Sequence, residues 1–176
     1  MSDAPAPTAD DPAFLGRLRS VSEELATDLT EELGAPRVLA FLWTTFLRNG
    51  DLPTAYFLPL LVRFREESAE RTVAALLARI RAETGRTFAV PVSYEPPDEH
   101  EPLGRLSAGH EAVWGLDPVD IAVCAAEGVQ CLLADRDRFL WPLCPDHRVV
   151  PHATRTPGGA AWVCSVTSHV VAPIPD

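Results

Sequence analysis

The sequence predicts an α+β protein, in which an N-terminal cluster of three to four helices precedes a small β-rich C-terminal half. Apolar residues recur at spacings of three and four through the first half, which is the period of amphipathic helices. Short β-branched runs separated by turn residues follow in the second half. A Pro-rich acidic stretch at 95–104 lies between the two patterns and predicts an exposed connection.

The first helix begins at Asp11 and Pro12, because aspartate can accept from the free amides of the first turn and proline suits the first helical position. Gly34 ends the pattern. The apolar stripe consists of Phe14, Leu18, Val21, Leu25, Leu29 and Leu33. It favours packing on a core over a seam for a second copy of the chain, since it is too short for a coiled coil.

A second helix is expected over 36–49, and it is apolar on nearly every side, which is typical of a buried helix. The sequence leaves open whether it lies at the centre of a helical cluster or in an oligomer interface. Further helix is expected up to Gly85, firm only from about Pro59, because Pro53 and Pro59 interrupt its start. Ser68 could instead cap a separate final helix.

The middle of the chain predicts alternating short elements. Residues 87–94 alternate and are β-branched, which indicates an edge strand. Residues 117–128 repeat the cap-then-proline start and end on glycine, so we expect a short helix followed by a strand at 129–133. A hairpin turning at Glu127 and Gly128 is the alternative. Residues 139–141 predict a second apolar strand.

Two short loops near the C-terminus each carry a cysteine and a histidine. Cys144 and His147 are separated by two residues, and Cys164 and His169 by four. Such spacings let both side chains of one loop face a metal ion, and Zn²⁺ takes four cysteine and histidine ligands in a tetrahedron. The Thr-Pro-Gly-Gly turn at 156–159 predicts a β-hairpin that brings the two loops together.

This arrangement resembles a zinc-ribbon or zinc-knuckle module over residues 141–172. It differs from the commoner all-cysteine ribbon because histidine stands second in each loop. We expect one structural zinc ion per chain, since four protein ligands leave no position for water and the ion would add folding energy. His152 is a substitute ligand if His147 faces away. The alternative is that Cys144 and Cys164 are buried thiols on neighbouring strands, or a disulfide or redox pair.

The predicted segments are 1–10 as a disordered tail, 11–86 as a helical domain, 87–140 as an α/β connecting region and 141–176 as a zinc-ribbon-like module. We expect Trp114, Trp141 and Trp162 to form the core around the metal site rather than a platform for a stacked ligand. Cys124 and Cys131 are expected to be small buried hydrophobes.

Composition and charge bound the partners. Hydrophobic residues make up 47% of the 176 residues, charged residues 23%, and the formal net charge is -10. No basic patch is available for phosphates, so we expect neither nucleic acid nor an anionic membrane as a partner. The sequence opens without a secretory signal pattern, and its longest apolar runs are too short to span a bilayer. We therefore expect a cytoplasmic protein with reduced thiols.

Three functions stay open. The first is a non-enzymatic adaptor that binds a protein partner, or a second copy of the chain, through the N-terminal helices. The alternative is a metal-dependent or acid–base hydrolase using His110, Glu111, Asp117 and Asp120, although no GxSxG, HExxH or P-loop motif accompanies them. A surface histidine and helix-capping aspartates explain the same residues. A weaker alternative is a zinc-ribbon regulator of nucleic acid, against which the charge argues.

Overall fold

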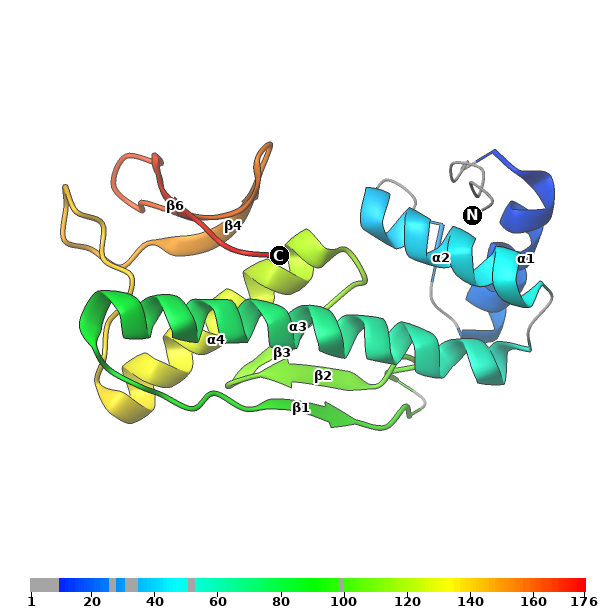
Figure 1. Ribbon diagram of the computed structural model, residues 1–176, viewed down its shortest axis with the longest axis horizontal. Helices are drawn as coiled ribbons and strands as arrows, with labels where there is room; N and C mark the ends of the chain where they lie inside the picture. The colour runs from blue at the N-terminus through cyan, green and yellow to red at the C-terminus, as the bar shows by residue number, and fades with distance from the viewer. Residues whose placement is uncertain (1–9, 26–27, 31–34, 51–52, 99) are drawn as a thin grey trace.

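The computed structural model describes residues 10–25, 28–30, 35–50, 53–98 and 100–176. Within them the chain is an α+β protein with four helices, mostly N-terminal, and two three-stranded antiparallel sheets (Figure 1). The helices are α1 (Pro12–Leu25), α2 (Pro36–Asn49), α3 (Thr54–Thr84) and α4 (Pro118–Asp137). The first sheet has the order β1 (Val92–Glu95), β2 (Arg105–Ala108), β3 (Glu111–Val113). The second has the order β4 (His152–Thr156), β5 (Gly159–Val163), β6 (Val170–Pro173).

Helices α1 and α2 pack with the start of α3 around a core of large side chains. The Asp11 carboxylate accepts a hydrogen bond from the Phe14 N–H at 2.8 Å, which confirms the predicted cap. Phe14 packs edge-on against Trp43 of α2.

The prediction of one helix up to Gly34 is wrong, because α1 ends at Leu25 and residues 28–30 are not helical. Leu29 of the predicted stripe is nevertheless buried, and Gly34 itself lies outside the described residues. Ala40 and other residues of one face of α2 are exposed, so α2 is not the centre of a helical cluster. The alternative of an oligomer interface stays a prediction.

Helix α3 is one continuous helix, so the predicted late start at Pro59 and the separate helix from Ser68 are both wrong. Pro59 lies close to the helix start, where the missing N–H removes a single hydrogen bond from an otherwise intact helix. The Ser68 hydroxyl donates to the Phe64 carbonyl at 2.8 Å within the helix and therefore caps nothing. Gly85 ends α3 as predicted, in the left-handed region with φ 71°.

Helix α4 continues through Gly128 to Asp137, so the predicted stop at Gly128 and the strand at 129–133 are wrong. A Cβ atom on Gly128 would lie 1.9 Å from the Ala108 carbonyl oxygen of β2. The glycine therefore permits close packing of helix on strand instead of ending the helix. The strand predicted at 87–94 forms only from Val92, as β1 (Val92–Glu95), and the strand predicted at 139–141 is wrong because these residues are irregular.

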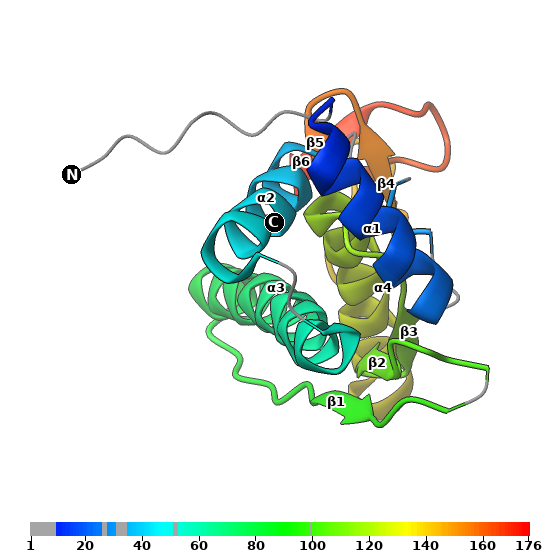
Figure 2. The same cartoon turned by 90° about the vertical axis from the view of Figure 1, so that its right-hand side faces the viewer.

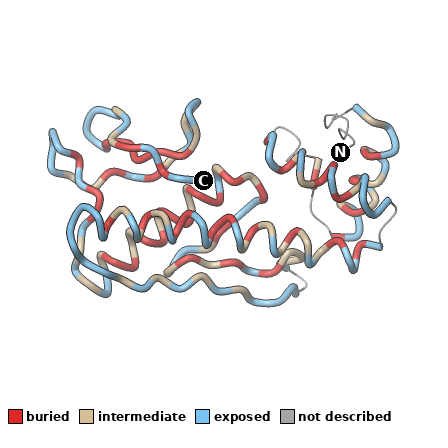
Figure 3. Tube along the Cα trace, in the orientation of Figure 1, coloured by how far each residue is buried: buried red, intermediate tan, exposed pale blue. Residues whose placement is uncertain are grey.

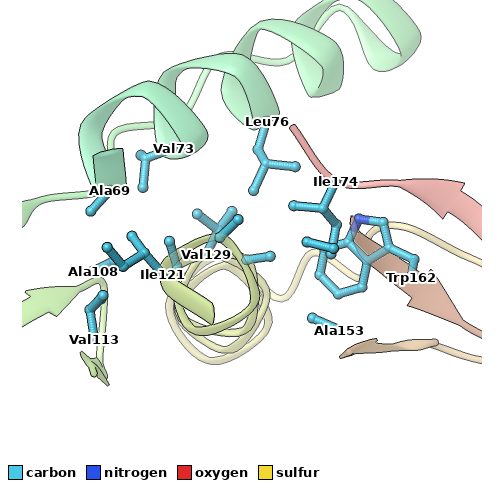
Figure 4. Packing of buried hydrophobic residues seen from close by; sticks show 14 of the residues in the cluster. Ala69, Val73, Leu76, Ala108, Val113, Ile121, Val129, Ala153, Trp162 and Ile174 are labelled. Carbon is cyan, nitrogen blue, oxygen red and sulfur yellow. The ribbon is translucent and has the colours of Figure 1, made fainter. Parts of the chain in front are cut away.

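Helix α4 lies between the two sheets and organises a second core (Figure 2). Viewed along its axis, α4 has α3 on one side, β2 and β3 on a second and the β4–β6 sheet on a third (Figure 4). Ile121 and Val129 of α4 belong to the same buried cluster as Leu76 of α3 and Trp162 of β5. Because this cluster includes residues of both sheets, the second sheet is anchored to the rest of the molecule through α4.

The two loops that contain the cysteine–histidine pairs adjoin the second sheet, one before β4 and the other between β5 and β6. The hairpin predicted at 156–159 is confirmed, since Thr156 of β4 pairs with Gly159 of β5. The sheet's central strand β5 is almost wholly buried, while exposed residues gather on the connecting loops (Figure 3). Among the described helices, none is long and apolar enough to cross a membrane. The predicted segment boundaries stay predictions.

Candidate metal centre

Two loops bring the four predicted side chains together at one end of the molecule (Figure 1). Cys144 and His147 lie between α4 and β4, and Cys164 and His169 lie between β5 and β6. One ligand atom from each residue lies within 4.8 Å of the other three. This group is the one cluster of Cys, His, Asp or Glu that the described residues place close enough to hold a metal ion.

Three of the sulfur–nitrogen distances are close to the edge of a zinc tetrahedron. The Cys144 Sγ lies 3.5 Å from His147 Nδ1 and 3.5 Å from His169 Nε2, and Cys164 Sγ lies 3.4 Å from His147 Nδ1. A zinc tetrahedron with Zn–S of about 2.3 Å and Zn–N of about 2.1 Å has an S···N edge of about 3.6 Å. The three distances agree with this edge to within about 0.2 Å, the tolerance expected of a metal site.

Both loops have the same backbone turn. In the first, the Arg148 N–H donates to the Cys144 carbonyl at 2.8 Å, and the Cys144 N–H donates to the Val149 carbonyl at 2.9 Å. In the second, the Ser168 N–H donates to the Cys164 carbonyl at 2.9 Å and the Cys164 N–H to the His169 carbonyl at 2.9 Å. The residue four places after each cysteine has positive φ, 55° and 57°. Two equivalent turns therefore present two equivalent, fully buried sulfurs.

The surroundings of Cys164 favour the thiolate, which is the form that binds a metal ion. Burial alone would raise its pKa, but hydrogen bonds from the Val166 and Thr167 amides and from the Cys144 and His147 side chains outweigh burial and lower the pKa to about 7. The Val166 N–H lies 3.5 Å from the sulfur. Both site cysteines are free thiols, so the alternative of a disulfide is not what the structure contains.

The two histidines use different ring nitrogens. His147 turns Nδ1 toward the cysteines, whereas His169 turns Nε2 toward Cys144 and its Nδ1 lies 2.8 Å from the Thr167 hydroxyl. The Asp146 carboxylate is 3.7 Å from His169 Nε2. His152 lies in β4, outside the cluster, and the substitution of His147 by His152 is therefore not needed.

Two of the three tryptophans are buried, as predicted, in the core around α4. Trp162 is fully buried and packs edge-on against Trp141, with ring centroids 6.2 Å apart. The Trp141 indole N–H donates to the Glu83 carboxylate at 2.8 Å, which ties the start of the first loop to α3. The prediction for Trp114 is wrong, because its side chain is 54% exposed and lies just after β3.

The four residues considered for acid–base catalysis lie in two separate places. Asp117 caps α4 by accepting the Val119 N–H, and with Asp120 it forms ion pairs with Arg155 of β4. His110 and Glu111 lie at the β2–β3 turn, where Glu111 adjoins Gly128. Eight residues of helix separate Asp120 from Gly128, which is about 12 Å. Cys124 and Cys131, which were predicted to be small buried hydrophobes, lie on α4 outside the cluster and are only half-buried, so that prediction is wrong in its degree of burial.

Sequence reasoning missed Thr167, which contacts a candidate ligand. The signal was present, because Thr167 stands three residues after Cys164, at the offset that His147 has from Cys144. Comparisons with protein-family models, with curated proteins and with solved structures find no match for this chain.

Proposed function

We propose that this chain is a non-enzymatic cytoplasmic interaction protein whose second sheet is fastened by one structural zinc ion, in a zinc-ribbon-like module. The observation that carries the zinc assignment is the approach of one ligand atom from each of Cys144, His147, Cys164 and His169 to within 4.8 Å of the others, with three sulfur–nitrogen distances of 3.4–3.5 Å. Two thiolates and two imidazoles are soft and borderline donors, which favour Zn²⁺ over Mg²⁺ or Ca²⁺.

A structural role follows from the number and position of the donors. Four protein ligands complete a zinc tetrahedron and leave no coordination position for a substrate or water. The ion would join the loop before β4 to the loop before β6, so that it closes the sheet at the end opposite the 156–159 turn. Folding energy from such a site replaces part of what a larger apolar core would supply.

The zinc assignment is tested by elemental analysis of the purified full chain. We expect one zinc per chain, and Cys144→Ser should lose it. Cys131→Ser is the matched control, because this half-buried thiol lies on α4 outside the cluster and should leave the stoichiometry at one. His147→Ala and His152→Ala form a second pair, of which only the first should weaken binding. Equal zinc in Cys144→Ser and wild type would overturn the proposal.

The interaction role is supported by exposed apolar side chains on the N-terminal helices. Leu47 near the end of α2 is 45% exposed and Tyr56 at the start of α3 is 68% exposed. We propose that this face contacts a protein partner or a second copy of the chain, and that nucleic acid, which needs a basic surface, is not its ligand.

The molar mass in solution separates the two partners. A mass above 19.1 kDa that returns to one chain in the Leu47→Ser/Tyr56→Ser variant supports self-association. Val166→Ser is the matched control, because Val166 is equally exposed but lies in the second metal loop. A monomer in all three proteins would overturn self-association. A separate protein partner would then be supported if a protein co-purifies with the wild-type chain but not with the double variant.

A further inference from the structure

The two metal loops, residues 144–149 and 164–169, have equivalent turns, but their histidines stand at different positions in the turn. His147 stands three residues after its cysteine, inside the turn, and the turn itself fixes where its side chain lies. His169 stands five residues after Cys164, at the residue whose carbonyl closes the turn, and it is followed by the exposed Val170. Thr167 occupies the place in the second turn that His147 occupies in the first. The second histidine therefore lacks the constraint that the turn gives the first.

Thr167 supplies a different constraint. Its Oγ1 lies 2.8 Å from His169 Nδ1, while His169 Nε2 lies 3.5 Å from Cys144 Sγ. An imidazole that offers the Nε2 lone pair to a metal keeps its proton on Nδ1, and that N–H needs an acceptor. The threonine hydroxyl oxygen is positioned to accept it. Metal-binding histidines commonly donate the second ring N–H in this way, which sets both tautomer and ring orientation.

We propose that Thr167 is a positioning residue of the metal site, which selects the Nδ1–H tautomer of His169 and holds Nε2 toward the ion. This inference rests on the proposed zinc site. A competing partner lies nearby, because the Asp146 carboxylate is 3.7 Å from the same Nε2 atom. A His169 ring released from Thr167 can place its proton on Nε2 and donate it to Asp146, which removes the lone pair from the metal.

The test measures zinc affinity of the full chain by competition with a chromophoric chelator. Thr167→Val removes the hydroxyl at nearly constant shape, and it should weaken zinc binding about 10- to 100-fold. Thr167→Ser keeps the hydroxyl and should restore affinity close to wild type. Ser165→Ala is the matched control, because this exposed hydroxyl lies in the same loop and its loss should leave affinity unchanged.

A second measurement reports the tautomer directly. Nitrogen-15 shifts of the His169 ring in the zinc-loaded protein should show a protonated Nδ1 and a metal-bound Nε2 in wild type and Thr167→Ser. Thr167→Val should lose the uniform Nδ1–H signature, while the His147 ring stays unchanged. Thr167 is exposed, so this substitution leaves both cores intact.

The outcomes separate the two proposals. No zinc in the wild-type chain would overturn the proposed function itself. Zinc in wild type, with equal affinity and an unchanged His169 tautomer in Thr167→Val, would overturn the role of Thr167 and leave the zinc site standing.

Discussion

The two cores of this molecule are built from different materials. The core of α1, α2 and the start of α3 consists of large side chains, and one of its twelve buried residues is alanine. The core around α4 includes both sheets, and eight of its nineteen buried residues are alanine. Small side chains let helix and strands approach closely, as at Gly128 and Ala108, but each buries little apolar area.

This difference indicates where the proposed metal ion would add most to stability. The buried part of the β4–β6 sheet consists largely of alanines around a single large side chain, Trp162. Burial stabilises in proportion to apolar area, so such a sheet gains less from packing than the N-terminal helices do. A cross-link between its two loops compensates by adding binding free energy to folding.

The largest expected effect is that of metal removal. Stripping zinc from the wild-type chain with a chelator should lower the free energy of unfolding by several kcal/mol, because zinc binding to such sites is worth about 10–16 kcal/mol in isolated fingers. Hydrogen exchange should speed up first in β4–β6, while α1 and α2 stay protected. Uniform loss of protection in both regions would contradict a separate role for the metal in the second core.

The next effect tests the first region alone. Phe14→Ala removes a buried ring that contacts Trp43 and Phe46, and it should cost about 3–5 kcal/mol by lost burial and the cavity left behind. Zinc stoichiometry should stay at one per chain. Denaturant unfolding of the zinc-loaded protein measures the cost, and a loss of zinc in this variant would show that the two regions are not independent.

A matched pair of glycines sharpens the comparison. Gly128→Ala places a Cβ atom 1.9 Å from the Ala108 carbonyl oxygen, so it should destabilise by about 1–3 kcal/mol despite the better helix propensity of alanine. Gly16→Ala in α1 meets nothing within 4 Å and should instead stabilise by about 0.5–1 kcal/mol. Thermal unfolding of the two variants checks the opposite signs, and equal shifts would deny that the second core is closely packed at Gly128.

Gly128 also shows where sequence reasoning stopped. Capping by Asp11, the buried stripe of α1 and the 156–159 hairpin were predictable because each depends on neighbouring residues. A glycine in an apolar run looks the same whether it ends a helix or admits a strand, and only the position of β2 distinguishes the two. Local patterns therefore predicted the class of fold but not how α4 packs.

The candidate metal site was more predictable than its surroundings. Two cysteine–histidine loops beside a turn were enough to identify the four side chains, because short ligand spacings are a local property. The exposure of Trp114 could not be predicted, since the hydrophobicity of a residue does not determine whether its side chain points toward the core or toward solvent after β3 ends. Thr167 was missed because its role depends on the equivalence of two loops in space.

The smallest effect concerns the polar contact between α3 and the metal loops. Glu83 accepts hydrogen bonds from Arg79 at 2.7 Å and from the Trp141 indole at 2.8 Å. Burial would raise the pKa of Glu83, but these two hydrogen bonds, with the charge of Arg79, outweigh it and lower the pKa below the ordinary 4.5. A carboxylate with a lowered folded-state pKa stabilises the protein above about pH 4.5, and this contribution is lost as the pH falls through the folded value.

Because the Glu83 side chain is 44% exposed and water screens its charge, Glu83→Gln should cost less than about 1 kcal/mol near neutral pH and still less in acid, so that its stability falls less steeply than that of wild type below about pH 5. Glu67→Gln is the matched control, because Glu67 forms the same i,i+4 ion pair with Arg63 on the same helix at similar exposure but has no tryptophan partner among the described residues, and such a pair is worth about 0–1 kcal/mol. Denaturant midpoints measured between pH 3.5 and 7 decide the matter. Parallel pH profiles for wild type and Glu83→Gln would show that Trp141 is held by packing against Trp162 rather than by its hydrogen bond to α3.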